Sequence, residues 1–257
     1  MEITRLPWTP LNRLPPAVRE AWDTVAAMPF ENLSKVIKFH EAGQDPAAAL
    51  RLPDEVLADH RRHGTGATCF ALVYLFRRLL DLRGIPAGLH TCDRRCGPDT
   101  HAAAVVAVAG QKWLFDPGFH IVQPLPAPGE DQAAFRAPGN PNASRVRRLS
   151  ETRFECYTGH AGAWTLRFIL KIPAVGEERF RAAWMASYSA EMMAYPVLNR
   201  FENGRMLYLQ KSTLVVRDGE GSEMVQLSMA DLPDRLAGWY GIAPGVIRRA
   251  LALCRRK

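Results

Sequence analysis

The spacing of apolar residues gives the first third of the chain a helical character. From Pro15 to about Leu82 the apolar positions recur with the helical period, and they predict helices over 16–28, from 46 for a short piece, over 54–61 and over 70–82. The last of these segments is apolar nearly all round, which is typical of a helix buried at the centre of a fold. Gly84 and Pro86 should end it.

The middle of the chain changes to short apolar and β-branched runs that are broken by glycine and proline. These runs predict strands over 88–92, 102–108, 112–116, 154–157 and 164–171. Strands of this length and spacing favour a small antiparallel sheet or barrel. The segment 124–142 is rich in Pro, Ala and Gly, and it predicts a long loop.

The last third of the chain mixes both patterns. Phe180, Trp184 and Tyr188 recur at helical spacing in the segment 177–188, which predicts a helix whose aromatic face packs in the core. Further along, the pattern predicts strands over 205–210, 213–217 and 223–227, then closing helices that begin near 228 and 244. We therefore expect an α/β module here.

Length and composition predict a globular protein without a membrane segment. The chain has 257 residues, of which 47% are hydrophobic, so it can bury a sizeable core. Its N-terminus lacks the apolar core of a signal peptide, and the apolar stretch 70–82 is shorter than a bilayer span and is interrupted by Arg77 and Arg78. We expect a cytoplasmic protein with no membrane partner.

Charge and cysteine usage narrow the possible partners. The net charge of +7 favours anionic partners, but the basic residues are scattered without an aromatic platform, which argues against nucleic acid. Five cysteines with irregular spacing predict free thiols. Cys92 and Cys96 lack the second Cys or His pair that a structural zinc site needs, so we expect no metal.

Cys69 is the most informative residue in the sequence. It follows the turn-like segment Gly64-Thr-Gly-Ala-Thr68, so Thr68 should be the N-cap and Cys69 the first residue of the apolar helix. The helix dipole and the free backbone N–H groups there favour a thiolate. Alone, Cys69 would more often be a small buried hydrophobe than a nucleophile, as free cysteines are.

Two downstream residues supply the partners that a cysteine nucleophile requires. Ala109-Gly110 predicts a hairpin turn whose register sets Ala103 opposite Asp116. His101 and Asp116 would then be diagonal neighbours on one face of the sheet, close enough for a hydrogen bond. A thiol, an imidazole base and an orienting carboxylate are the groups needed for thiol-based acyl transfer.

Four sequence blocks together resemble the arylamine N-acetyltransferase family. They are Pro29-Phe-Glu-Asn-Leu33, the Gly-x-x-Cys-Phe segment 66–70, Thr100-His101 and Phe115-Asp-Pro-Gly-Phe119, and their order and spacing match that family. The segment 232–242 resembles the closing region of the family more weakly, so the resemblance covers most of the chain.

The resemblance implies an α+β fold of three parts. These are an N-terminal helical bundle with the nucleophile (1–84), a central antiparallel β-barrel with the His and Asp (85–175) and a C-terminal α/β lid (176–257). It also implies a ping-pong transfer of an acetyl or other acyl group from acyl-CoA, or from a carrier-bound acyl chain, through Cys69 to a small arylamine or hydrazine acceptor. Cys69, His101 and Asp116 would form the triad, and Thr100, Gly118 and Phe119 would approach CoA.

The sequence departs from the family around its nucleophile. Where the family has Arg, a second Gly, Glu and Asn, this sequence has Thr65, Ala67, Ala71 and Val73, and His120 replaces the last Gly of the Asp-x-Gly-Phe-Gly loop. Arg61 or Arg62 is expected to pair with Glu31 in place of the missing arginine. These changes keep the nucleophile and leave the acyl donor and acceptor open.

Two other functions fit part of the sequence. A transglutaminase-like amidase or peptidase would use the same Cys, His and Asp with another acceptor, but it would leave the block 29–33 unexplained. A catalytically silent binding scaffold would keep the fold and use the cleft for a ligand, because fold alone does not imply function.

Overall fold

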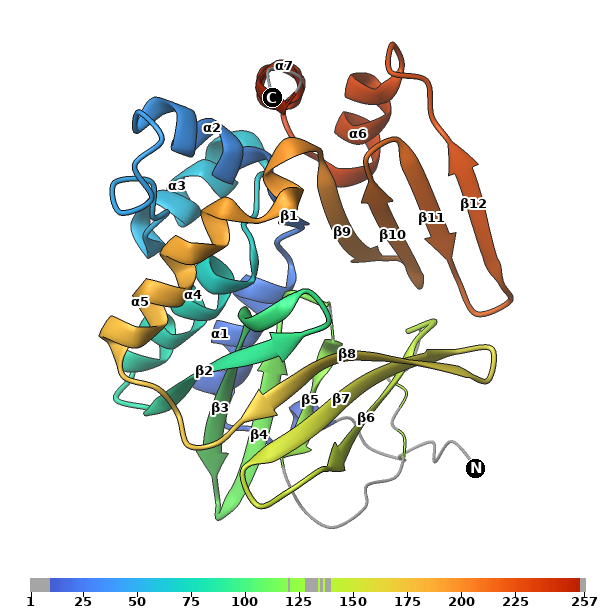
Figure 1. Ribbon diagram of the computed structural model, residues 1–257. Helices are drawn as coiled ribbons and strands as arrows, with labels where there is room; N and C mark the ends of the chain where they lie inside the picture. The colour runs from blue at the N-terminus through green and yellow to red at the C-terminus, as the bar shows by residue number, and fades with distance from the viewer. Residues whose placement is uncertain (1–9, 120, 128–133, 135, 137–139, 255–257) are drawn as a thin grey trace.

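The N-terminal part of the protein is helical, as the sequence pattern predicts. The computed structural model describes residues 10–119, 121–127, 134, 136 and 140–254 (Figure 1). Its helices here are η1 (Pro10–Arg13), α1 (Pro16–Ala26), α2 (Leu33–Glu41), α3 (Pro53–His63) and α4 (Cys69–Asp81). Helix α2 was not predicted, because its buried positions include Ser34 and Lys35 and so its apolar period is broken.

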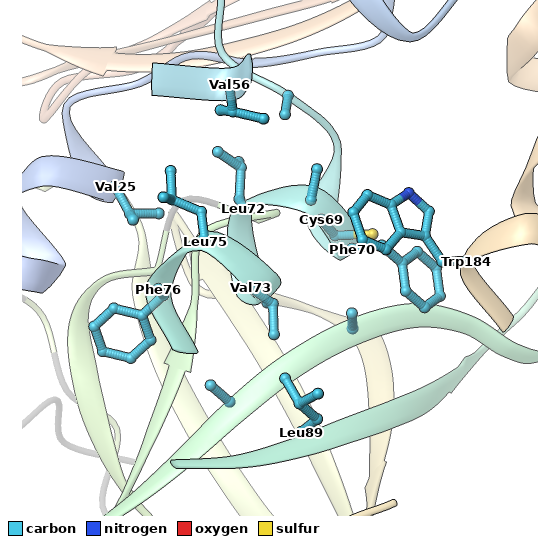
Figure 2. Packing of buried hydrophobic residues seen from close by; sticks show 14 of the residues in the cluster. Val25, Val56, Cys69, Phe70, Leu72, Val73, Leu75, Phe76, Leu89 and Trp184 are labelled. Carbon is cyan, nitrogen blue, oxygen red and sulfur yellow. The ribbon is translucent and has the colours of Figure 1, made fainter. Parts of the chain in front are cut away.

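Helix α4 forms the centre of the main hydrophobic core. Most of its side chains are buried, and Figure 2 shows Leu72, Leu75 and Phe76 projecting from it into the cluster. The ring centroids of Phe76 and Phe115 lie 4.7 Å apart. Because Phe115 belongs to the sheet, α4 packs directly against the barrel. Because α4 is apolar nearly all round, it packs against other helices on one side and against the sheet on another.

Within the described residues, a seven-stranded antiparallel sheet curls into a nearly closed barrel. Its order is β5-β4-β3-β2-β8-β7-β6, and β5 and β6 approach each other at the seam. The strands are β2 (Ala87–Arg94), β3 (Gly97–Val108), β4 (Gln111–Asp116), β5 (Ile121–Ala127), β6 (Ala143–Arg148), β7 (Arg153–His160) and β8 (Ala163–Lys171). This confirms the predicted central barrel.

The loop predicted over 124–142 is partly wrong, because β5 extends into it. Pro124 and Pro126 made this segment look like a loop in the sequence. An outermost strand of a sheet nevertheless tolerates proline, because it need not donate backbone N–H groups to neighbours on both sides. Strand β6 begins directly after the predicted loop and was also missed. His120, which the sequence places next to the site, lies outside the described residues.

The C-terminal part combines helices with a second sheet. Helix α5 (Glu177–Ala186) and the short helices η2 (Ser187–Ser189) and η3 (Glu191–Ala194) lead to β9 (Val197–Glu202), β10 (Arg205–Gln210), β11 (Thr213–Arg217) and β12 (Ser222–Gln226). Helices α6 (Leu232–Tyr240) and α7 (Pro244–Cys254) close the fold (Figure 1). The predicted α+β class, with a helical part, a barrel and an α/β part, is confirmed.

A short strand joins the first part of the chain to the last. β1 (Phe30–Glu31) pairs with β9, so in the part of the chain that the structure describes the second sheet has five strands in the order β1-β9-β10-β11-β12. The first and last parts therefore share one hydrogen-bonded sheet. The boundaries at residues 84 and 175 stay predictions.

None of the described helices is both long enough and apolar enough to cross a bilayer.

Candidate active site

Cys69 is the first residue of α4, as the sequence predicts. Thr68 stands at the N-cap, as predicted, with φ of −84° and ψ of 170°, and its side chain makes no capping hydrogen bond. The thiol is 7% exposed, and Figure 2 shows Cys69 beside Phe70 and Trp184. The nucleophile candidate therefore lies at an open helix N-terminus within an apolar wall.

The block 29–33 fixes the loop that precedes Cys69. A Cβ on Gly66 would lie 1.8 Å from the carbonyl oxygen of Pro29, so only glycine fits there. The backbone N–H of Glu31 donates to the carbonyl of Ala67 at 3.1 Å, next to the bridge between Phe30 and Ala67. These contacts give a physical reason for a block that the sequence identified only by resemblance.

Asn32 ties the same loop to the C-terminal part of the protein. Its buried side chain donates to the carbonyls of Met192 at 2.5 Å and Tyr195 at 2.8 Å, and it accepts from the backbone N–H of Val197 at 2.8 Å. One side chain thus satisfies three backbone groups where the chain enters β9. Buried polar groups need such partners, which is why an amide is placed here.

Arg51 supplies the buried cation beside Glu31, so the prediction that Arg61 or Arg62 fills this role is wrong. Its guanidinium is 3% exposed and lies 3.8 Å from the Glu31 carboxylate. It donates to the carbonyl of Gly66 at 2.7 Å and to the Asp59 carboxylate at 2.8 Å. Arg51 therefore reaches the nucleophile loop from a different part of the sequence than the family arginine.

The other replaced positions are apolar or unpaired. Ala71 and Val73 are buried in the main core, so they pack where the family has polar side chains. Thr65 is 2% exposed, and its hydroxyl oxygen finds no hydrogen-bond partner among the described residues. Thr65 therefore does not replace the positive charge of an arginine at that position.

His101 and Asp116 lie side by side on β3 and β4. The observed register runs from Val108 opposite Gln111 to Ala104 opposite Phe115, which confirms the predicted hairpin. The imidazole Nε2 and the Asp116 Oδ2 are 3.1 Å apart, and both side chains are almost fully buried. The diagonal pair expected from the sequence is therefore in hydrogen-bond contact.

The turn after Asp116 closes around the same group of side chains. Asp116 Oδ1 accepts from the backbone N–H groups of Gly118 at 2.8 Å and Phe119 at 3.2 Å. The Phe119 ring centroid lies 4.9 Å from that of His101. One carboxylate oxygen therefore faces the imidazole while the other fixes the turn.

The three residues predicted to approach CoA lie in different settings. Gly118 and Phe119 border the group formed by Cys69, His101 and Asp116. Thr100 precedes His101 on β3, and its hydroxyl donates to the carbonyl of Gly97 at 2.8 Å. Their roles toward CoA stay predictions.

The Cys69 thiol and the His101 imidazole each shift the pKa of the other. Burial acts to raise the pKa of Cys69, but the charge of His101 and its hydrogen bond outweigh burial and lower it. Burial acts to lower the pKa of His101, but the Asp116 carboxylate and the Cys69 thiolate outweigh burial and raise it to about 9. Both shifts favour the pair of thiolate and imidazolium, which is the reactive form.

Lys35 is a buried cation that sequence reasoning missed. It is 3% exposed, and its Nζ donates to the carbonyl of Ser187 at 3.0 Å and to the Ser187 hydroxyl at 2.6 Å. Burial lowers the pKa of Lys35 to about 7, while the nearby Cys69 acts to raise it. Nothing in the local pattern distinguishes Lys35 from a surface lysine such as Lys38, so only the structure could find it.

The pKa shift of Cys69 predicts that this thiol is alkylated faster than any other at low pH. Because its pKa is lowered, the thiolate persists as the pH falls, whereas an ordinary thiol loses about tenfold in rate per pH unit. We expect iodoacetamide at pH 6.5 to label Cys69 before the exposed Cys96, as peptide mass spectrometry would measure. Faster labelling of Cys96 in the native protein would contradict an activated Cys69.

Metal-binding groups are not found in the part of the chain that the structure describes. There, no set of three or more His, Cys, Asp or Glu side chains is arranged to hold an ion.

Comparison with known proteins identifies the fold. The sequence matches no protein-family model and no curated protein. The structure, however, resembles the arylamine N-acetyltransferase of Nocardia farcinica with a TM-score of 0.75 at 19% identity, over 96% of this chain and 93% of that one. For the enzyme of Salmonella typhimurium the TM-score is 0.71 at 20% identity, over 94% and 95% of the two chains.

A third solved structure shows that the acidic member of the triad varies among proteins of this fold. The arylamine N-acetyltransferase NAT3 of Bacillus cereus has a TM-score of 0.68 at 17% identity, over 88% of this chain and 90% of that one, and is described as having a unique Cys-His-Glu catalytic triad. This chain has the fold of the arylamine N-acetyltransferases, with a Cys, a His and an Asp grouped in its interior.

Proposed function

We propose that this protein is an acyltransferase of the arylamine N-acetyltransferase type, which moves an acetyl group from acetyl-CoA to a small arylamine or hydrazine. The observation that carries the proposal is the grouping of Cys69, His101 and Asp116 around the start of α4, within a fold that the chain shares with such enzymes. A thiolate, an imidazolium and an orienting carboxylate are together the groups that covalent acyl transfer requires.

In the first half-reaction the Cys69 thiolate attacks the thioester carbonyl of the acyl donor. The tetrahedral oxyanion forms at the N-terminus of α4, where free backbone N–H groups and the helix dipole stabilise negative charge. The intermediate collapses by breaking the bond to the CoA sulfur, which leaves as a thiol after taking the proton of His101. The acyl group then stays on Cys69 as a thioester.

In the second half-reaction an amine takes the acyl group. His101 is now neutral, so it accepts a proton from the attacking nitrogen, and the bond to the Cys69 sulfur breaks to regenerate the thiolate. Asp116 keeps the imidazole in one orientation through both steps. Gly118, Phe119 and Thr100 are proposed to border the path by which CoA and the acceptor reach Cys69.

Two predictions from the sequence have no independent support. The comparisons give none to a carrier-bound acyl donor, so the proposal is restricted to free acyl-CoA. The cytoplasmic location stays a prediction.

The acyl-enzyme gives the direct test of this function. We expect incubation with acetyl-CoA to add the mass of one acetyl group to the intact protein, and we expect Cys69→Ala to abolish the adduct because its thiol is the acceptor. Intact-mass spectrometry measures both results, and Cys96→Ala is the matched control because Cys96 is an exposed free thiol that is not a member of the triad. No adduct from acetyl-CoA or from several longer acyl-CoA donors would overturn the proposal.

A further inference from the structure

An arginine pair lies against the aromatic wall of the candidate site. Arg94 at the end of β2 and Arg167 on β8 have their guanidinium carbons 5.4 Å and 5.7 Å from the ring centroid of Phe119. Phe119 in turn contacts the imidazole of His101. The charge of Arg94 also acts on the Cys69 thiol, since it helps to lower that pKa. Two cations therefore stand one aromatic ring away from the reacting groups.

Arg217 on β11 extends this pair into a cluster across the two sheets. Its Nη1 donates to the Asn142 side chain at 3.1 Å, while its buried Nε finds no hydrogen-bond partner among the described residues. Burial lowers the pKa of Arg167, and the charges of Arg217 and Arg94 act in the same direction. In this arginine cluster, Arg94, Arg167 and Arg217, the charges of the other two thus act against the charged form of Arg167.

The cluster has no carboxylate to balance it in the described parts of the chain. None of its members forms an ion pair there, although charged neighbours on the same strands do. Asp93, the residue before Arg94, pairs with Arg153 at 2.8 Å and with Lys171 at 2.6 Å instead. Half-buried cations that repel each other without a counter-ion are costly, and such arrangements mark sites that bind an anion.

We propose that the arginine cluster binds a carboxylate carried by the small substrate that reaches Cys69. This proposal rests on the proposed function and names its substrate class: an acceptor amine, or an acyl group, that bears a carboxylate. Guanidinium groups suit this ligand because their planar N–H donors match the two carboxylate oxygens.

The position of the pair favours a substrate carboxylate over the phosphates of CoA. When the thioester carbonyl is at Cys69, the whole pantetheine arm separates it from the phosphate groups. Arg94 and Arg167 contact the ring that contacts His101, so they lie nearer the reacting carbon than an extended arm would place a phosphate. A carboxylate on a benzene ring or on a short acyl chain is short enough to reach these arginines while the reacting group is at Cys69.

The binding test uses a protein that cannot turn over. We expect Cys69→Ala protein to bind para-aminobenzoate about tenfold or more tightly than the neutral para-aminobenzamide in titration calorimetry, because charge-assisted hydrogen bonds contribute on that scale. Adding Arg94→Gln or Arg167→Gln should remove the difference. Adding Arg248→Gln, which removes an exposed charge on α7, should preserve it. Equal binding of the two compounds, with no dependence on either arginine, counts against the acceptor as the source.

The second arm asks whether the carboxylate belongs to the acyl group. In protein with Cys69 intact, the rate of adduct formation from succinyl-CoA is compared with that from butyryl-CoA, and each again with Arg167→Gln, because Arg94 also acts on the pKa of the Cys69 thiol. An arginine-dependent preference for succinyl-CoA assigns the carboxylate to the acyl group. The proposal is overturned if neither pair of compounds shows such a preference, or if Arg167→Gln slows acetyl, butyryl and succinyl transfer alike, which would assign the arginines to CoA itself.

The two arms separate this inference from the proposed function. Preferential binding of para-aminobenzoate in the absence of any acetyl adduct would support the carboxylate site while the acyltransferase function fails. A normal acetyl adduct without any carboxylate preference would do the reverse. Circular dichroism of each variant establishes that it is folded before binding is compared.

Discussion

Replacing Asp116 by Asn should reduce kcat/KM for acyl transfer by about a thousandfold to ten-thousandfold while the protein stays folded. The carboxylate is the main reason that the pKa of the buried His101 is raised to about 9 rather than lowered by burial. Without it, the pKa of His101 should fall, because burial is then opposed by the Cys69 thiolate alone. The imidazolium stabilises the thiolate less, and the amide no longer holds His101 in one tautomer.

The fold should tolerate this change because Asn has the shape of Asp. Its amide oxygen can still accept the backbone N–H groups of Gly118 and Phe119, so the turn after β4 keeps its hydrogen bonds. We expect the free energy of unfolding to fall by about 1 to 2 kcal/mol, the scale of one altered buried hydrogen bond.

Steady-state kinetics and thermal unfolding measure the two effects on Asp116→Asn. Asp99→Asn is the matched control, because Asp99 also pairs with a cation, Lys171, but lies outside the triad. Its φ of 53° suits Asn, so this control should keep both activity and stability close to normal. A loss of activity that only follows a loss of folded protein would refute the orienting role of Asp116.

Sequence reasoning succeeded where the signal is local in the chain. The hairpin at Ala109-Gly110 fixes the register of β3 against β4 within a few residues, and that register alone brings His101 and Asp116 together. Cys69 at the start of an apolar helix is likewise a local signal, since the break in period and the turn residues before it are adjacent. The candidate triad could therefore be named before its fold was known.

The rest depends on contacts between distant segments, which a one-dimensional pattern does not contain. Arg51 binds Gly66 only because the chain between α2 and α3 folds back on the nucleophile loop, whereas Arg61 and Arg62 remain on the exposed side of α3. Lys35 is buried because the residues after α5 cover it. The arginine cluster draws its members from three strands in two sheets. Each of these sites is a consequence of tertiary packing.

Replacing Gly118 by Ala should cost about a hundredfold or more in acyl-transfer rate through crowding of the triad. A Cβ on residue 118 would lie 2.7 Å from Cε1 of His101, 2.9 Å from Cβ of Cys69 and 3.2 Å from Oδ1 of Asp116. The imidazole cannot move aside freely, because the rings of Phe119 and Phe168 lie 4.9 Å and 4.7 Å from it. A displacement of about 1 Å in a reacting group can cost this much rate.

The matched control for this variant is Gly238→Ala in α6, where an added Cβ meets nothing within 4 Å. That variant should keep full activity, and the helix should be slightly more stable because alanine is the better helix former. For Gly118→Ala we expect the rates of acetyl-adduct formation and of Cys69 alkylation to fall together, because the methyl group separates the thiol from the imidazole that activates it. Normal alkylation with a slowed acetyl transfer would instead mean that residue 118 acts on the acyl donor and leaves the thiolate and imidazolium pair undisturbed.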